Sequence, residues 1–174
     1  MSISSLLILF FLFCLFSLAL AAASLAPWVP TWKKDLPRIF KLANLNPGEI
    51  FYDLGCGNGK VVFYAAKNFP IKAIGIELAF PLYLTCKLRQ LFNYKKNLKF
   101  WNKDIFKVDL SPADVIYIFG TPKPIQQRLK QKLEKELKPG ARIISYAFPF
   151  NEWQPKIIDK PSDKDINIYL YQRS

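Results

Sequence analysis

The residues best suited to chemistry form a short loop between an apolar strand and a helix. The loop contains, in order, Asp53, Leu54, Gly55, Cys56, Gly57, Asn58 and Gly59. Glycine lets the backbone adopt unusual dihedral angles and approach a ligand closely. A dinucleotide site favours Gly-x-Gly-x-x-Gly, whereas this loop has Gly-x-Gly-x-Gly with an acid two residues before the first glycine. A carboxylate and backbone carbonyls suit a ligand that carries cationic groups rather than a pyrophosphate.

Two further acids follow the next two predicted strands. Glu77 ends one strand, where a carboxylate can bind both ribose hydroxyls, and Asp104 follows the other. Taken singly, Asp53 has an alternative role as a cap, Glu77 as a surface acid and Asp104 as a turn residue. Together at consecutive strand ends, the acids and the loop predict a site for S-adenosylmethionine (SAM). The predicted cofactor-binding residues in these segments are Asp53, Gly55, Cys56, Gly57, Asn58, Gly59, Glu77, Leu78, Asp104 and Ile105.

A third group of residues follows the next apolar strand and consists of Phe119, Gly120, Thr121 and Pro122. Ligands of parallel sheets bind beyond the carboxyl ends of the strands, so these four residues are candidates for the acceptor pocket, where catalysis would occur. Phe119 has an alternative role as a core aromatic residue. The tetrapeptide Asn-Pro-Pro-Tyr is absent from the sequence, which argues against methylation of adenine N6 or of glutamine.

The composition excludes several mechanisms. The chain has no histidine, which removes Ser-His-Asp and Cys-His catalysis and the usual general base of enzymes that deprotonate oxygen. The cysteines Cys14, Cys56 and Cys86 are scattered without Cys-x-x-Cys spacing, so neither a metal site nor a disulfide framework is predicted. Chemistry must therefore depend on carboxylates, backbone groups, hydroxyls or a bound cofactor.

Strands and helices alternate through most of the chain. The expected strands are Glu49–Asp53, Ile71–Glu77, Leu98–Asn102, Ala113–Phe119 and Ala141–Tyr146. The expected helices are Asp35–Leu45, Gly59–Asn68, Pro81–Asn93 and Pro122–Leu137. In the tail, Trp153–Gln172, two strand-like pieces flank a polar turn and indicate an antiparallel hairpin. This order predicts an α/β fold with the Rossmann-like sheet of class I methyltransferases, mostly parallel, with an antiparallel C-terminal hairpin.

The N-terminus has a different composition. The segment from Ile3 to Ala26 carries no charged side chain, and about 20 apolar residues suffice for a helix to span a bilayer. We therefore predict a transmembrane anchor at residues 1–26 and a methyltransferase domain at residues 27–174. Trp28 and Trp32 are expected at the membrane interface. The alternative is a cleaved signal peptide, because the small residues at 19–23 resemble a cleavage region.

The positive charges near this segment indicate its orientation. Lys33, Lys34, Arg38 and Lys41 all follow the apolar run, and Met1 to Ser5 contains no lysine or arginine. By the positive-inside rule, the chain is a single-pass membrane protein with a cytoplasmic catalytic domain and an external N-terminus. The same basic residues favour anionic lipid headgroups as a partner.

The net charge of the chain is +12, and the lysines are spread along the sequence. Such a charge fits binding to nucleic acid or to anionic lipid, or it reflects the composition of the genome. A membrane anchor makes nucleic acid the less favoured partner. The sequence leaves the oligomeric state open.

Several motifs resemble one family, the small membrane-anchored protein-lysine N-methyltransferases, and the chain is similar to a prokaryotic-type member. Animal members of that family modify the c-ring protein of the mitochondrial ATP synthase and the adenine nucleotide translocase. The motifs are Pro-x-Val-Pro-Thr at 27–31, Tyr-Asp-Leu-Gly-x-Gly-x-Gly at 52–59, Gly-x-Glu at 75–77, Phe-Gly-x-Pro at 119–122, Leu-Lys-Pro-Gly-Ala-Arg at 137–142 and Phe-Pro…Trp at 148–153. The resemblance adds Thr31 to the cofactor site. It also shows a departure, because this chain has Asn58 and Lys60 where the family usually has Asp and Arg.

The resemblance implies a SAM-dependent enzyme that methylates a lysine amine of a membrane protein. The amine attacks in line at the sulfonium methyl group, and the enzyme supplies alignment and desolvation, so no histidine base is required. Phe119, Tyr146, Phe148 and Trp153 are candidates for an aromatic mouth that admits the lysine. Alternatives are methylation of a small molecule or of a lipid amine or quinone, methylation of RNA, and a non-enzymatic scaffold.

Overall fold

A mixed seven-stranded sheet forms the centre of the molecule. The computed structural model describes residues 2–92 and 97–174. The strands lie in the order β3-β2-β1-β4-β5-β7-β6, and their bounds are β1 Ile50–Leu54, β2 Lys72–Glu77, β3 Leu98–Asn102, β4 Val115–Ile118, β5 Arg142–Tyr146, β6 Ile157–Asp159 and β7 Ile168–Gln172. Strands β3, β2, β1, β4 and β5 pair in parallel, and β7 pairs antiparallel with both β5 and β6. The predicted parallel sheet with an antiparallel hairpin is confirmed.

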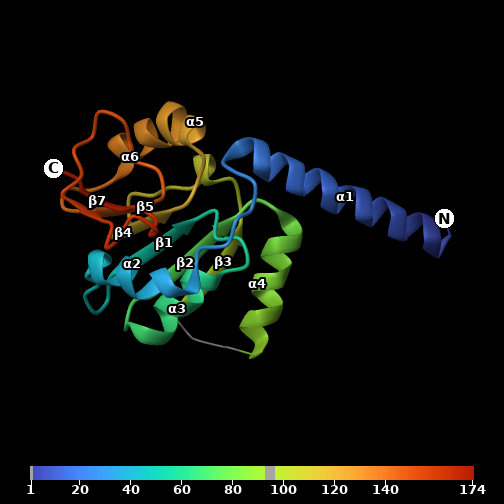
Figure 1. Cartoon of the computed structure of the whole chain (residues 1–174). Coiled ribbons are helices and arrows are strands. Elements are labelled where there is room, and N and C mark those ends of the chain that lie inside the picture. Colours follow the sequence, from blue (N-terminus) through green and yellow to red (C-terminus); the bar gives the residue numbers. More distant parts are fainter. Residues whose placement is uncertain (1, 93–96) are drawn as a thin grey trace.

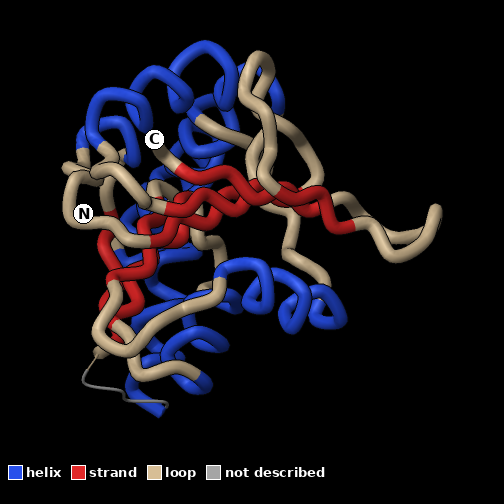
Figure 2. Tube along the Cα trace, turned by 90° about the vertical axis from the view of Figure 1, so that its left-hand side faces the viewer, coloured by secondary structure: helices blue, strands red, loops and turns tan. Residues whose placement is uncertain are grey.

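Helices cover both faces of this sheet (Figure 2). Their bounds are α1 Ile3–Ser24, η1 Lys33–Asp35, α2 Leu36–Ala43, α3 Lys60–Asn68, α4 Phe80–Phe92, η2 Ile105–Lys107, α5 Pro122–Pro124, η3 Ile125–Leu129 and α6 Lys130–Glu136. On one face, α2, α3 and α4 bury a core with strand residues such as Phe51 and Ile144. On the other face, η3 and α6 bury a second core with Leu54 and Ile118. Alternate side chains of each strand enter opposite cores, so the strands are apolar throughout.

The predicted bounds differ from the observed ones mainly at the ends of elements. Each predicted strand of the parallel sheet lies within two residues of the observed one. The predicted end of the fourth helix, Asn93, lies outside the described residues. The predicted helix Pro122–Leu137 consists instead of α5, the π-helical η3 and α6. Pro122 and Pro124 lack the N–H groups that a regular first turn uses, and this favours an irregular start.

Helix α1 projects from the domain at the side where α4 lies (Figure 1). Its side chains are almost all exposed, although most are leucine, isoleucine or phenylalanine, and Ser17 is the buried residue. Among the described helices, α1 is long and apolar enough to cross a membrane. Its C-terminal half contacts the domain, because the Phe13 ring lies 5.5 Å from the Phe80 ring and Ser17 Oγ accepts a 2.7 Å hydrogen bond from Phe80 N–H.

Candidate active site

Two buried carboxylates lie at adjacent strand ends. Asp53 is near the end of β1 and Glu77 ends β2, and they are 2% and 6% exposed. Glu77 accepts hydrogen bonds from Gly57 N–H at 2.8 Å and from Ala79 N–H at 2.7 Å. Asp53 Oδ2 has no hydrogen-bond partner among the described residues. Burial raises the pKa of both carboxyl groups, and the nearby Glu77 charge raises that of Asp53 further.

The glycine loop follows Asp53 and lets other parts of the chain approach its backbone. Gly55 and Gly57 have φ angles of 79° and 56°, which side chains other than glycine rarely adopt. A Cβ atom at Gly55 would lie 2.8 Å from Leu25 Cδ2, and one at Gly57 would overlap the Trp28 indole. Both positions therefore require glycine for conformation and for close approach.

The pocket over this loop contains most of the predicted cofactor residues. It encloses about 830 Å³ of space, within the range typical of small-molecule sites. The predicted residues that line it are Thr31, Asp53, Gly55, Cys56, Gly57, Asn58, Glu77, Leu78, Asp104 and Ile105. Gly59 lies behind this wall as the N-cap of α3, with the Phe100 ring and Cys86 Sγ close to its Cα. The structure thus brings ten of these eleven residues together in one pocket.

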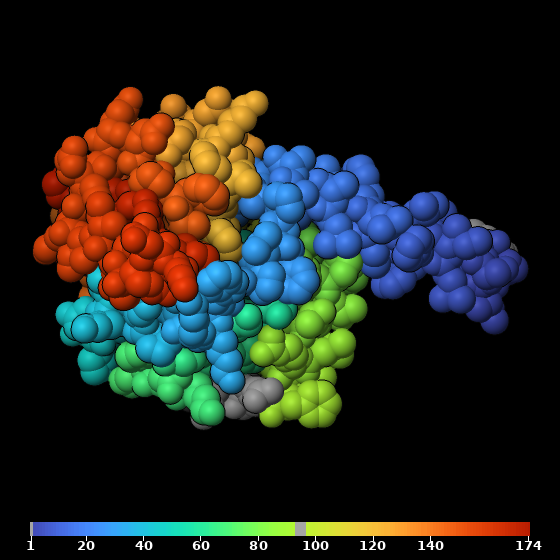
Figure 3. All heavy atoms as spheres, viewed as in Figure 1, coloured from blue at the N-terminus to red at the C-terminus, as the bar shows by residue number. Residues whose placement is uncertain are grey.

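The N-terminal segment forms the opposite wall of the same pocket. Lining residues come from the last turns of α1, including Leu18, Ala21 and Ala22, and from the whole connector between Leu25 and Thr31. Figure 3 shows this light-blue segment lying across the front of the domain, between the green and orange parts of the chain. The site is therefore built from residues at both ends of a long sequence separation.

Hydrogen bonds fix the connector in this position. Thr31 Oγ1 and the Tyr117 hydroxyl lie 2.8 Å apart in the buried interior, and Lys60 Nζ donates to Thr31 O at 2.7 Å. Thr121 donates to Leu25 O from its N–H at 3.3 Å and from its hydroxyl at 2.8 Å. Lys60, at the position where the resembling family has arginine, thus anchors the connector to the start of α3.

The four predicted acceptor-pocket residues have different surroundings. Phe119 lines the pocket, and its ring packs edge-on against Tyr146 at 4.8 Å. Gly120 is buried under Leu25, since a Cβ atom there would lie 2.8 Å from Leu25 Cδ1. Thr121 holds the Leu25 carbonyl, and Pro122 begins α5.

The other aromatic residues expected at the mouth have separate positions. Tyr146 is fully buried behind Phe119, and its hydroxyl donates to Asp35 Oδ2 at 2.7 Å. Trp153 stacks on Phe150 at 4.6 Å, and Phe148 packs against the core on the α6 side of the sheet. Of the four expected residues, Phe119 is the one that lines the pocket.

Leu25, Trp28 and Tyr117 were not expected at the site. Trp28 was expected at a membrane interface, and its indole lies against Gly57 while half of the residue stays exposed. Leu25 lies within the apolar run, which gives no sign of a contact with residues 55 and 120. A signal for Tyr117 exists, because its hydroxyl lies in a strand that is otherwise apolar and requires a buried partner.

The described residues fit SAM. The unpaired Asp53 Oδ2 offers a buried negative group to a cationic ligand, and the glycine loop leaves its backbone open to close approach. Asp104 lies at the pocket rim, where Oδ1 accepts a 3.0 Å hydrogen bond from Phe106 N–H and Oδ2 stays available. The donor set therefore matches a ligand with an ammonium group, a ribose and an adenine amino group.

Comparisons with known proteins agree with this site. The family model described as the ANTKMT methyltransferase domain matches residues 53–157. A protein-lysine N-methyltransferase of Saccharolobus islandicus is 38% identical over 154 residues, which cover 83% of this chain and 92% of that protein. The lysine N-methyltransferase of Homo sapiens that is named for the c-ring protein of ATP synthase is 35% identical over 130 residues, and the match spans 74% of this chain and 54% of that protein.

Solved structures show the same fold. An RNA methyltransferase from Salinibacter ruber in complex with S-adenosyl-L-homocysteine superposes with a TM-score of 0.78 at 27% identity, covering 83% of this chain and 93% of that chain. A SAM-dependent methyltransferase from Thiobacillus denitrificans, also with S-adenosyl-L-homocysteine, has a TM-score of 0.60 at 23% identity, over 74% of this chain and 53% of that one. The chain therefore belongs to the ANTKMT methyltransferase domain family and is a class I methyltransferase that uses SAM as its cofactor.

Proposed function

We propose that this enzyme transfers methyl groups from SAM to a lysine amine of a membrane protein, while α1 anchors it to the bilayer. The relatives named above support lysine as the acceptor, and an adenine nucleotide translocase lysine N-methyltransferase of Mus musculus is 31% identical over 130 residues. Two of these names refer to membrane-embedded acceptors. The apolar α1 supports a location at the membrane.

The observation that carries this proposal is the shared wall of the pocket. Ala21 and Ala22 of α1 line the same pocket as Asp53 and Glu77. A helix that enters the bilayer and also borders the cofactor site holds that site close to the membrane surface. A lysine at the end of a membrane-embedded segment would then reach the pocket without leaving the interface.

The cofactor-binding residues divide their roles according to their chemistry. Asp53 is proposed to pair with the ammonium group of SAM, Glu77 with the ribose hydroxyls and Asp104 with the adenine amino group. Bound SAM supplies an electrophilic methyl group. The loop around Gly57 and Asn58 sets the cofactor against the strand ends, and this positioning is the main contribution to rate.

The acceptor is proposed to enter beside Phe119, Gly120, Thr121 and Pro122. Apolar groups at this edge, including the Phe119 ring and Leu25, desolvate an incoming lysine and lower its pKa, so that the neutral amine is available. A neutral amine is nucleophilic without a base, which fits a chain that has no histidine. The transferred methyl group leaves an alkylammonium product that loses its proton to water.

The orientation in the membrane is part of the proposal. We propose an anchor at residues 1–26, a catalytic domain at residues 27–174 and a single-pass arrangement with the domain in the cytoplasm. Lys33, Lys34, Arg38 and Lys41 support this orientation, since basic residues favour the cytoplasmic side. SAM is made in the cytoplasm, which agrees with the same placement.

The test is methylation of solubilised membranes. The full-length enzyme is incubated with detergent-solubilised membranes from a strain that lacks its gene and with SAM that carries a labelled methyl group. We expect label on lysine in one or a few membrane proteins, identified by mass spectrometry, and no label with the Asp53→Asn variant. Label confined to lipid or RNA would refute the lysine proposal while leaving the methyltransferase assignment intact.

Two other acceptor classes have specific support. RNA is supported by the net charge of +12 and by the printed name of the Salinibacter ruber protein. It predicts binding that weakens steeply with salt. A small amine is supported by a phosphoethanolamine N-methyltransferase of Arabidopsis thaliana, which is 32% identical over 107 residues. The wall formed by α1 favours a membrane protein over both.

A further inference from the structure

We propose that the outer face of α4 is a second lipid-contact surface, which rests in the headgroup region of the bilayer beside α1. This inference rests on the membrane location proposed above and specifies how the domain lies on the membrane. The face is defined by Leu84, Leu88, Leu91 and Phe92. It is referred to below as the α4 outer face.

The α4 outer face is apolar and open to solvent. Leu88, Leu91 and Phe92 are 52%, 75% and 87% exposed, and Leu84 is 38% exposed. These residues recur at the spacing of one side of a helix, whereas Cys86 on the opposite side is buried against the sheet. Scattered apolar residues are common on surfaces, but four large ones on one helix face mark an interaction site.

The charges around this face fit an anionic lipid surface. The sequences of α4 and β3 contain no Asp or Glu, and they carry Lys87, Arg89 and Lys99, with Lys103 directly after β3. Lys87, Lys99 and Lys103 are exposed. Interfacial helices combine an apolar face with basic residues in this way. The partner is therefore expected to be lipid with negatively charged headgroups.

The attachment of α1 sets the level of α4. Phe13 packs on Phe80 and Ser17 bonds to Phe80 N–H, so the N-terminus of α4 lies level with the middle of α1. Only the first ten helical residues, Ile3–Leu12, extend beyond these contacts, which is about 15 Å at 1.5 Å per residue. The hydrocarbon core is about 30 Å thick. Hence α1 can enter lipid deeply only if the domain comes down onto the membrane.

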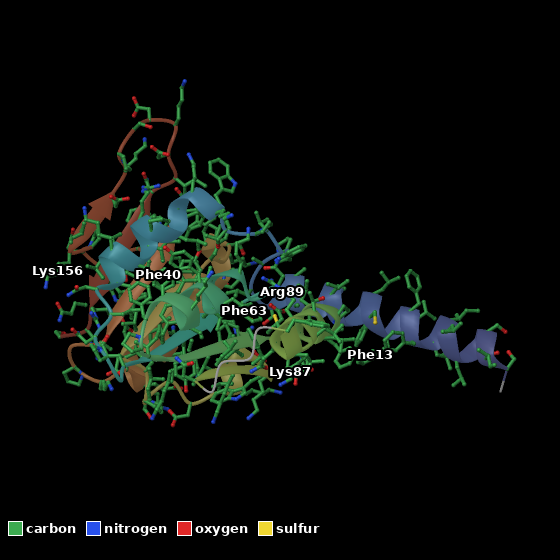
Figure 4. All side chains as sticks on the ribbon, turned by 90° about the horizontal axis from the view of Figure 1, so that it is seen from below. Phe13, Phe40, Phe63, Lys87, Arg89 and Lys156 are labelled. Atoms are coloured by element: carbon green, nitrogen blue, oxygen red, sulfur yellow. The ribbon has the colours of Figure 1, made fainter. Side chains whose placement is uncertain are left out.

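The side of the domain that then meets the membrane is the one that carries α4. In Figure 1, α4 forms the outer edge of the domain on the side toward which α1 projects, and it runs across the direction of α1. Figure 4 shows Phe13 and Lys87 toward this side, whereas Lys156, next to β6, lies at the opposite end. A helix that lies across the axis of the anchor lies parallel to the membrane plane.

The experiment measures depth in the bilayer with spin labels on the full-length protein. Cys14 is replaced by alanine, and the buried Cys56 and Cys86 stay. Single variants Leu88→Cys and Leu91→Cys receive a nitroxide label. Matched variants are Ile158→Cys on β6, where the native residue is 56% exposed, as a control for water, and Leu9→Cys on α1 as a control for lipid.

Each labelled protein is reconstituted into vesicles of phosphatidylcholine and phosphatidylglycerol. We expect the ratio of collision rates with oxygen and with a water-soluble nickel complex to be several-fold higher at 88 and 91 than at 158. Without phosphatidylglycerol, the ratio at 88 and 91 should fall. No fall would refute the role of the lysines.

The other outcomes separate the two proposals. A lipid-like ratio at 9 with water-like ratios at 88 and 91 would refute the α4 contact and leave the membrane location standing; α1 would then have detached from α4. A water-like ratio at 9 would refute both proposals. Spin–spin broadening between labels at 88 would show a second copy of the chain on this face and would also refute the lipid contact.

Discussion

At the scale of single residues, the main feature of the site is a carboxylate that the protein alone leaves unsatisfied. Asp53 is almost fully buried, and one of its oxygens has no partner among the described residues. Burial and the Glu77 charge raise its pKa well above the usual aspartate range. A group of this kind costs stability in the free protein and is retained because the cofactor needs it.

The first prediction concerns Asp53→Asn. An acid with a raised folded-state pKa holds its proton in the folded protein at pH values where the unfolded chain has lost it, so stability falls as pH rises through that window. Removing the carboxylate should therefore raise the free energy of unfolding of the ligand-free protein by about 1–3 kcal/mol at neutral pH. Denaturant unfolding measures this change, and calorimetry should show loss of SAM binding.

Asp104→Asn is the matched control. Asp104 is only partly buried and accepts a hydrogen bond from Phe106 N–H, so its replacement should weaken SAM binding without raising stability. In the native protein, SAM affinity should decline on acidification at a higher pH than an ordinary aspartate would give. Asp53→Asn with unchanged SAM affinity would remove this carboxylate from the site.

At the scale of elements, the connector and the strand ends meet at Leu25 and Gly120. In Gly120→Ala, the new Cβ atom would lie 2.8 Å from Leu25 Cδ1, and the resulting strain should cost about 1–3 kcal/mol of stability. Leu25→Ala alone should cost about 2–5 kcal/mol through lost packing. Together, the two substitutions should cost less than the sum, because the smaller side chain relieves the overlap. Strictly additive values in denaturant unfolding would contradict this contact.

A second element-scale prediction concerns the attachment of α2 to the C-terminal hairpin. Arg38 bonds to Asp159 Oδ2 at 2.6 Å, to Asp35 at 2.9 Å and to the Ile166 carbonyl at 3.0 Å, and its side chain is 17% exposed. Arg38→Gln should destabilise the protein by about 3 kcal/mol, because it leaves a buried charge unpaired. Lys34→Gln breaks the exposed pair with Asp165 and should cost under about 1 kcal/mol. Equal losses in thermal unfolding would contradict this ranking.

The elements differ in how far their sequence determines them. β1 and β4 are predictable because runs such as Val115–Ile118 are apolar throughout and buried on both faces. The convergence of Asp53, Glu77 and Asp104 follows from the rule that parallel strands end at one edge. The contact of Leu25 with Gly120 depends on residues far apart in sequence, and no local pattern encodes it. The π-helical η3 was missed because its residues, beginning at Ile125, have ordinary helical periodicity.

At the scale of the whole molecule, two truncations separate anchoring from cofactor binding. Deleting residues 2–12 removes the part of α1 beyond its contacts with α4, so SAM affinity should stay unchanged while membrane binding is lost. Deleting residues 2–24 also removes Leu18, Ala21 and Ala22 from the pocket wall, and SAM should bind roughly tenfold more weakly, or about 1.4 kcal/mol. Calorimetry gives both affinities, and circular dichroism checks folding. Equal affinities for the two truncated proteins would show that α1 adds nothing to the pocket.

The hydrogen bonds from Thr121 to Leu25 also have a consequence for the order in which the protein is made. The two residues are 96 positions apart, so Leu25 leaves the ribosome long before its partner exists. Because chains fold from the N-terminus during synthesis, α1 has time to enter the bilayer before β4 and its loop are available. The pocket closes only when the nascent domain folds back onto a helix that is already in place. Cofactor binding is thus a late step in biogenesis, and it reports that membrane insertion and folding are both complete.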